Sequence, residues 1–106
     1  MTNGSYSLKA AMGDRQKHLH FVFMNYDPEY ERLQSDRTKR GAREVETYLS
    51  KKHDDLLVKK LEPGTYDKTC SLFIVDAFAV QITDAQANVL RSAKEVRVVE
   101  KNQEFT

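Results

Sequence analysis

The sequence predicts a single α+β domain in which four antiparallel strands form a sheet and two helices cover one face of it. Two periodicities support this fold class. Apolar residues alternate with polar or smaller ones in short segments, as in half-buried strands, and they recur every three to four residues in longer segments, as in amphipathic helices. The chain has 106 residues and is 40% hydrophobic. That is enough for one modest core, so we expect one domain.

The second half of the chain contains a strand, a helix and another strand with clear boundaries between them. Three apolar residues form one face of the first of these strands: Phe78, Val80 and Ile82. Thr83 is followed three residues later by Gln86, which is the capping-box pattern of a helix N-terminus. β-Branched residues return at positions 96–99 and predict the next strand.

An earlier strand is predicted at residues 18–24. Three large apolar residues share one of its faces, which we expect to point into the core: Leu19, Phe21 and Phe23. His20 and Val22 then fall on the opposite, outward face. The Asp-Pro-Glu sequence at 27–29 predicts a helix start, because Asp can cap the helix, Pro fits its first position and Glu suits its first turn.

A longer amphipathic helix is predicted to end near Leu57. Its apolar stripe consists of Ala42, Val45, Leu49 and Leu56. Before this stripe, residues 36–43 carry four basic side chains around Gly41, and either one helix passes through Gly41 or two helices meet there. These basic residues could contact a phosphate or RNA, but in a protein of formal charge +1 a solvated helix face is the simpler interpretation.

The remaining elements complete a βαββαβ order. Pro63-Gly64 is the strongest turn signal, residues 66–75 form the second strand, and a tight turn at 76–77 returns the chain as the third strand. This order predicts the ferredoxin-like arrangement, with both helices on one face of the sheet and the other face exposed. On that exposed face we place Ala79 and Gln81 beside the outward residues of the first strand. Cys70 is expected to be a small buried residue of the second strand.

Composition argues against several broad classes of protein. With 17 basic and 16 acidic residues, the chain has no strong field for nucleic acid or a membrane surface. No apolar run is long enough to span a bilayer, and the single Cys70 excludes an internal disulfide. Residues 1–17 have no apolar segment of the signal-peptide type. We therefore expect this segment to be a mobile tail and the protein to be intracellular, unless a targeting segment is missing.

The residues also show no recognisable catalytic motif. Cys70 with a histidine, or any serine, could supply a nucleophile, yet none stands in a known arrangement. A Gly-rich phosphate loop and a Cys-x-x-Cys pair are both absent from the sequence. His18 and His20 could begin a metal site, but no second pair of spaced ligands follows. The inward positions assigned to Phe21 and Phe23 argue against an RNA-recognition sheet, which exposes its aromatic residues. We expect no enzymatic activity, cofactor, metal or nucleic-acid partner.

The strand, helix and strand of the second half resemble a known family. The run AFAVQITDAQANVL, followed by VRVVE, resembles the second half of the subtilisin-propeptide family of peptidase inhibitors, and most of all the versions that precede plant subtilases. In that family the strand reads like G-F-A-x-x-L-T, the helix like E-E-Q-A-x-x-L and the last strand like V-V-x-V-E. The segment at residues 64–68 is also similar to the family, and the resemblance extends from Leu19 to the C-terminus. The chain departs from the pattern at Asp76-Ala77, where the family usually has Asn-Gly, and at Lys94-Glu95, where it often has Pro-Gly.

The resemblance implies a stand-alone inhibitor of subtilisin-like serine proteases, monomeric when free, with residues 18–101 as the inhibitor domain. By this analogy the exposed sheet face docks on the enzyme through His20, Val22, Ala79 and Gln81. A C-terminal tail enters the substrate cleft in extended, product-like form, and its residues are Asn102, Gln103, Glu104, Phe105 and Thr106. Two alternatives remain: a folding aid or interaction domain of the same fold without inhibitory activity, and a small-ligand domain.

Overall fold

The computed structural model describes residues 16–102, which form a four-stranded antiparallel sheet and three helices. The strands are β1 (His18–Met24), β2 (Asp67–Leu72), β3 (Ala77–Ile82) and β4 (Val96–Lys101). The helices are α2 (Pro28–Gln34), α3 (Lys39–Lys60) and α4 (Asp84–Arg91). The α+β class and the antiparallel sheet are confirmed, whereas the expected number of helices, two, is wrong.

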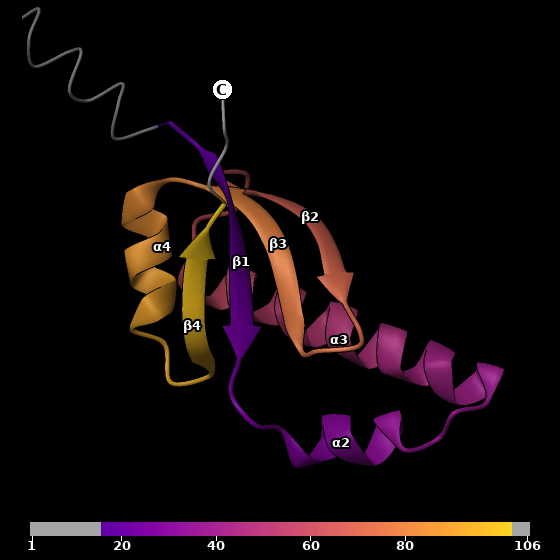
Figure 1. Cartoon of the computed structure of the whole chain (residues 1–106). Helices are drawn as coiled ribbons and strands as arrows, with labels where there is room; N and C mark the ends of the chain where they lie inside the picture. The colour runs from indigo at the N-terminus through magenta and orange to yellow at the C-terminus, as the bar shows by residue number, and fades with distance from the viewer. Residues whose placement is uncertain (1–15, 103–106) are drawn as a thin grey trace, which may run out of the picture.

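The sheet has the strand order β2-β3-β1-β4, so β1 and β3 are central and β2 and β4 are edge strands. All three neighbouring pairs are antiparallel. Figure 1 shows α3 running behind the sheet, with the start of β1 and the end of β4 at one end of the molecule and the turn between β2 and β3 at the other. The two ends of the sheet are therefore separate places at which a function could be located.

The additional helix arises from a break between α2 and α3. The side chain of Asp36 accepts hydrogen bonds from the backbone N–H (3.0 Å) and the hydroxyl (2.7 Å) of Thr38. Thr38 in turn accepts from Gly41 N (3.0 Å) and caps α3, which then continues through Gly41. A Cβ on Gly41 would collide with the backbone oxygen of Asp36. Glycine is therefore required inside this helix because it allows the chain to fold back closely before α3 begins.

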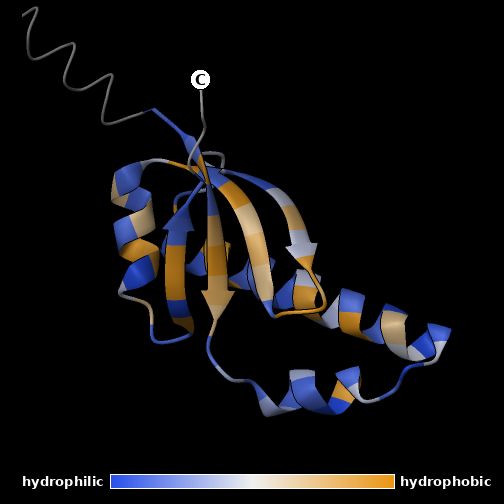
Figure 2. Cartoon of the chain, in the orientation of Figure 1, coloured by the Kyte–Doolittle hydropathy of each residue, from blue (hydrophilic) through white to orange (hydrophobic). Residues whose placement is uncertain are grey.

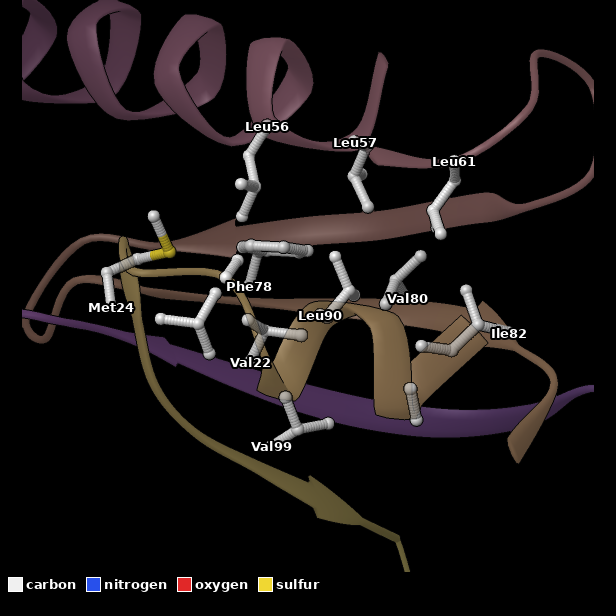
Figure 3. Close-up of a cluster of buried hydrophobic side chains, with 13 residues drawn as sticks. Val22, Met24, Leu56, Leu57, Leu61, Phe78, Val80, Ile82, Leu90 and Val99 are labelled. Atoms are coloured by element: carbon white, nitrogen blue, oxygen red, sulfur yellow. The ribbon is translucent and has the colours of Figure 1, made fainter. Parts of the chain in front are cut away.

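The main core lies between the sheet and the helices α3 and α4. Figure 3 shows Leu56 and Leu57 of α3, and Leu61 directly after it, pointing toward the side chains of β3. Phe78, at the centre of β3, has no exposed surface. The predicted inward face of β3 is confirmed, because Phe78, Val80 and Ile82 all belong to this cluster. Burial of these side chains supplies the main driving force for folding, about 1.5–3 kcal/mol for each large residue.

A second, smaller cluster joins α2 to α3. Tyr30, Val45 and Leu49 form it, and Phe73 packs against it from the turn after β2. The hydroxyl of Tyr30 donates to the carbonyl oxygens of Phe73 (2.7 Å) and Ile74 (2.9 Å). Helix α2 therefore supports the turn between β2 and β3. Among residues 16–102, no helix is long and apolar enough to cross a membrane.

Candidate functional site

Strand β1 shows the reverse of the face assignment made from the sequence. In its pairing with β3, His20 lies opposite Val80 and Val22 lies opposite Phe78. Directly opposite residues of an antiparallel pair share one face of the sheet. His20 is 1% exposed, and Val22 has no exposed surface. The expectation that these two residues face a partner is wrong, because both lie in the layer that packs against the helices.

The opposite face of the sheet carries the large apolar residues of β1 instead. Leu19, Phe21 and Phe23 are half-buried and pair with residues of β3 that point away from the helices. We call this surface the open face, and its residues are Leu19, Phe21, Phe23, Asp67, Cys70, Leu72, Ala77, Ala79, Gln81, Val98 and Glu100. The predicted outward face of β3 is thus retained, although Ala79 is only 2% exposed. Figure 2 shows that β1 and β3 are apolar along most of their length.

The aromatic residues of the open face remove one argument that the sequence offered against RNA binding. Phe21 and Phe23 lie on the open face and not in the core, so the premise of that argument was wrong. The charges around them still do not favour a phosphate backbone, which needs a surplus of basic groups. Arg97 lies 5.7 Å from the centre of the Phe23 ring, but Glu100 is opposite Phe21 in the β1–β4 ladder. The open face is therefore apolar with mixed charges.

The first residue after β4, Asn102, is paired with β1 beside the open face. The backbone N–H of Asn102 donates to the carbonyl oxygen of Leu19 (2.8 Å), which extends the pairing of β4 with β1 by one residue. Lys101 lies 3.3 Å from the carboxylate of Asp84 at the start of α4. The other residues of the predicted tail lie outside the described residues: Gln103, Glu104, Phe105 and Thr106.

His20 is held inside the sheet by contacts at both ring nitrogens. Its Nδ1 lies 2.8 Å from the carbonyl oxygen of His18, and its Nε2 lies 3.8 Å from the Asp84 carboxylate. Burial lowers the pKa of His20, although the hydrogen bond to His18 and the charge of Asp84 oppose this shift. Among residues 16–102 no group of three or more histidine, cysteine or carboxylate side chains could hold a metal ion.

A cluster of buried polar side chains connects α3 to the hairpin of β2 and β3. His53 has no exposed surface, and its Nε2 lies 2.7 Å from Asp76 Oδ1 while its Nδ1 lies 2.8 Å from Ser71 Oγ. Burial lowers the pKa of His53, against the effect of Asp76. The ammonium group of Lys52 contacts Asp76 and donates to Asp27 (2.8 Å). This cluster thus ties together three segments that are distant in sequence.

Asp27 receives a second hydrogen bond in this cluster. The hydroxyl of Tyr48 donates to Asp27 Oδ2 at 2.7 Å. Burial alone would raise the pKa of Asp27, but the hydrogen bonds from Lys52 and Tyr48 hold it below its usual value. Burial and the Asp27 carboxylate together raise the pKa of Tyr48. The carboxylate therefore stays charged and the phenol neutral, which keeps every group in the cluster paired.

Ser71, His53 and Asp76 have the residue types and contact order of a hydrolase triad, but their surroundings do not favour catalysis. A catalytic histidine must exchange protons with a bound substrate, and the imidazole of His53 is inaccessible to solvent. Ser71 lies within the β2–β3 ladder opposite Phe78. The three residues connect α3 to the hairpin, and this structural role accounts for the arrangement.

Comparisons with protein-family models, curated proteins and solved structures found no match to this chain. The candidate site therefore depends on the residues themselves.

Cys70, expected to be buried, is exposed on β2. It lies opposite Ala79 and so belongs to the open face.

The sequence interpretation missed two groups of residues, for different reasons. The open-face residues of β1 were placed in the core because both faces of that strand carry apolar side chains. The partners in the buried cluster are far apart in sequence, so no local pattern identifies them. One signal was available: Tyr48 and Lys52 fall on the apolar side of α3, and a lysine on that side needs a buried carboxylate.

Proposed function

We propose that this chain inhibits subtilisin-like serine endopeptidases. The open face docks on the enzyme, and the segment after β4 runs into the substrate cleft as a product-like strand. One observation carries the proposal. None of the described helices covers the apolar open face, and this face reaches the end of β4. Leu19 belongs to the open face, and its carbonyl oxygen accepts the N–H of Asn102. The docking face and the first residue of the tail, Asn102, are thus held together by the pairing of β1 with the end of β4.

The docking residues differ from those that the sequence suggested. Leu19, Phe21 and Phe23 take the place of His20 and Val22, while Ala79 and Gln81 remain on the docking side. The two phenylalanines are half-buried in the free protein, so part of their apolar area is still available for burial in a complex. Aromatic residues at the centre of an interface commonly contribute most of its binding energy.

In the proposed complex, the backbone of the segment after β4 pairs with the substrate cleft of the protease. Main-chain hydrogen bonds between a peptide and the edge of an enzyme subsite give affinity without depending on particular side chains. The ladder between β1 and β4 already holds residues 96–102 in an extended conformation. Less conformational freedom is then lost on binding, which favours affinity.

We also propose that the sheet is of the ferredoxin-like type. The strand order β2-β3-β1-β4 supports this assignment, because it is the 4-1-3-2 order read from the other edge. Helices α3 and α4 would be the two helices of the βαββαβ pattern, since both contribute residues to the main core. Helix α2 is then an addition before the first of them.

A truncation and two substitutions test the proposed inhibition. Removal of residues 103–106 should abolish strong inhibition of a responsive subtilisin-like protease while changing the free energy of unfolding by well under about 1 kcal/mol. Phe21→Ser should also weaken inhibition, by disrupting the docking face. Ile74→Ala is the matched control, because Ile74 is 89% exposed at the opposite end of the sheet. The inhibition constants and urea unfolding curves of all variants are measured together.

Three outcomes would decide between the functions. Full inhibition by the truncated chain would show that the tail does not enter the cleft. If Phe21→Ser and Ile74→Ala behave alike, the open face is not the docking surface. A protein that inhibits no subtilisin-like protease would favour the folding-aid or interaction-domain alternative.

A further inference from the structure

A hollow of about 710 Å³ lies at the end of the sheet opposite Asn102, between α3 and the loops that border β1 and β4. Its inner wall includes Met24 and Leu56, which are 7% and 4% exposed and belong to the main core. Tyr26, which is 79% exposed, lines it from the loop after β1. The volume is within the range of small-molecule sites, about 300–1,000 Å³. The hollow therefore offers an apolar surface of a size that suits a small organic ligand.

Four lysines and three carboxylates line this hollow, so its lining carries one positive charge in excess. Lys51 pairs with Asp55 (2.9 Å), and Lys59 pairs with Glu95 (3.0 Å). Lys94 is exposed, and among residues 16–102 no carboxylate lies within 4.0 Å of its ammonium group. The remaining lining charges, Lys52 and Asp27, are engaged with each other in the buried cluster.

We propose that the hollow binds a small amphipathic anion, an aromatic or aliphatic carboxylate. Its apolar body would cover Met24 and Leu56, and its carboxylate would lie against the ammonium group of Lys94. An organic cation would meet the excess positive charge, and an inorganic anion would leave the apolar wall exposed to water. An apolar body with one negative group matches both properties of the hollow.

This site is independent of the proposed inhibition. Met24 pairs with Val96 at the beginning of β4, whereas the tail leaves the sheet after the end of β4. None of the open-face residues lines the hollow. A ligand bound there should leave inhibition of a protease unchanged, so either proposal can fail without the other.

The test is an NMR titration of the ¹⁵N-labelled full chain with 4-phenylbutyrate. We expect saturable amide shifts confined to the hollow, in residues 24–27, 51–59 and 94–95. Lys94→Gln should raise the dissociation constant by about two- to fivefold, as expected for loss of one solvent-exposed charge contact. Lys39→Gln is the matched control, because Lys39 is exposed at the other end of α3, and it should leave affinity unchanged. The neutral analogue 4-phenylbutanol should bind wild type and Lys94→Gln equally.

Tyr26→Ala separates the apolar contribution from the charge. Because Tyr26 is largely exposed, its replacement should leave the melting temperature unchanged while weakening both ligands. The proposal is overturned if the shifts fall on the open face, if no shifts appear at millimolar ligand, or if Lys94→Gln and Lys39→Gln have the same effect.

Discussion

The two faces of β1 have opposite roles. His20, Val22 and Met24 point into the core, whereas Leu19, Phe21 and Phe23 lie on the open face. The three residues on the open face are the more apolar group, and the buried group includes the imidazole of His20. Burial alone would favour the reverse arrangement. Large apolar residues that stay partly exposed, while a histidine is buried, are what the proposed docking surface would require.

The buried face tolerates its histidine because the ring nitrogens of His20 have polar contacts. The open face has no corresponding need, since the large side chains of β1 on that face are only half-buried. Packing and hydrogen bonding therefore determine which residues the buried side can hold. In the proposed complex, the docking partner determines which residues suit the open side. Substitutions on the two sides should accordingly separate stability from binding.

The largest expected effect compares Phe78 with Phe21. Phe78→Ala removes a fully buried side chain that packs against the His53 ring, 4.8 Å away between centroids. It should cost about 3–5 kcal/mol of unfolding free energy, a large part of the roughly 5–15 kcal/mol available to a domain of this size. Phe21→Ala should cost about 1 kcal/mol or less. Equal losses in urea unfolding would mean that Phe21 is a core residue.

The next effect concerns the buried cluster. Asp76→Ala leaves Lys52 and His53 without a shared acceptor, and an unpaired buried polar group should reduce stability by about 2–3 kcal/mol. Asp55→Ala removes an exposed carboxylate of α3, the helix that carries Lys52 and His53, and should change stability by about 0.5 kcal/mol at most. Thermal unfolding of both variants measures the difference. A small effect for Asp76→Ala would show that water replaces its contacts.

A smaller effect is expected at the start of α4. Thr83 accepts from Gln86 N (3.1 Å), and Thr83 N donates to Gln86 Oε1 (3.0 Å), so the capping box is complete. Thr83→Ala should cost about 1 kcal/mol. Thr47→Ala, at an exposed interior position of α3, should not destabilise the protein. Chemical unfolding curves distinguish the two, and equal losses would contradict a capping role for Thr83.

The smallest effect is a pH dependence that arises on the buried side. Burial lowers the pKa of both His20 and His53 in the folded protein below the ordinary value of 6.5. The unfolded chain therefore binds more protons below that pH, and stability falls as the pH drops from about 6.5 toward the folded-state pKa values. Urea midpoints should decrease slightly between about pH 7 and pH 6. Urea midpoints that stay constant, or NMR titrations in which His20 and His53 show the ordinary pKa, would contradict this prediction.

Much of the fold could be predicted from local chemistry. The capping box at Thr83, the helix start at Asp27 and the inward face of β3 depend on neighbouring residues, and the structure confirms each of them. The α+β class and the four-stranded antiparallel sheet follow from the same patterns. These features are predictable because each is determined within one turn of helix or one strand.

The errors arose where distant residues decide the outcome. The face of β1 is determined by its pairing with β3, and alternation alone could not distinguish two faces that are both largely apolar. The break between α2 and α3 depends on the Asp36 and Thr38 hydrogen bonds, which also explain Gly41. The buried cluster combines side chains from a loop, a helix and a hairpin, so no sequence window contains it.

The irregular pairing of β2 affects how the protein behaves at high concentration. Its ladder with β3 shifts between Lys68 and Cys70, so the edge strand carries a bulge. A regular exposed edge can pair with the same edge of another copy and start an intermolecular sheet. A bulge twists the strand and interrupts the row of free backbone groups. The chain can therefore expose an apolar sheet face while this edge is protected against aggregation.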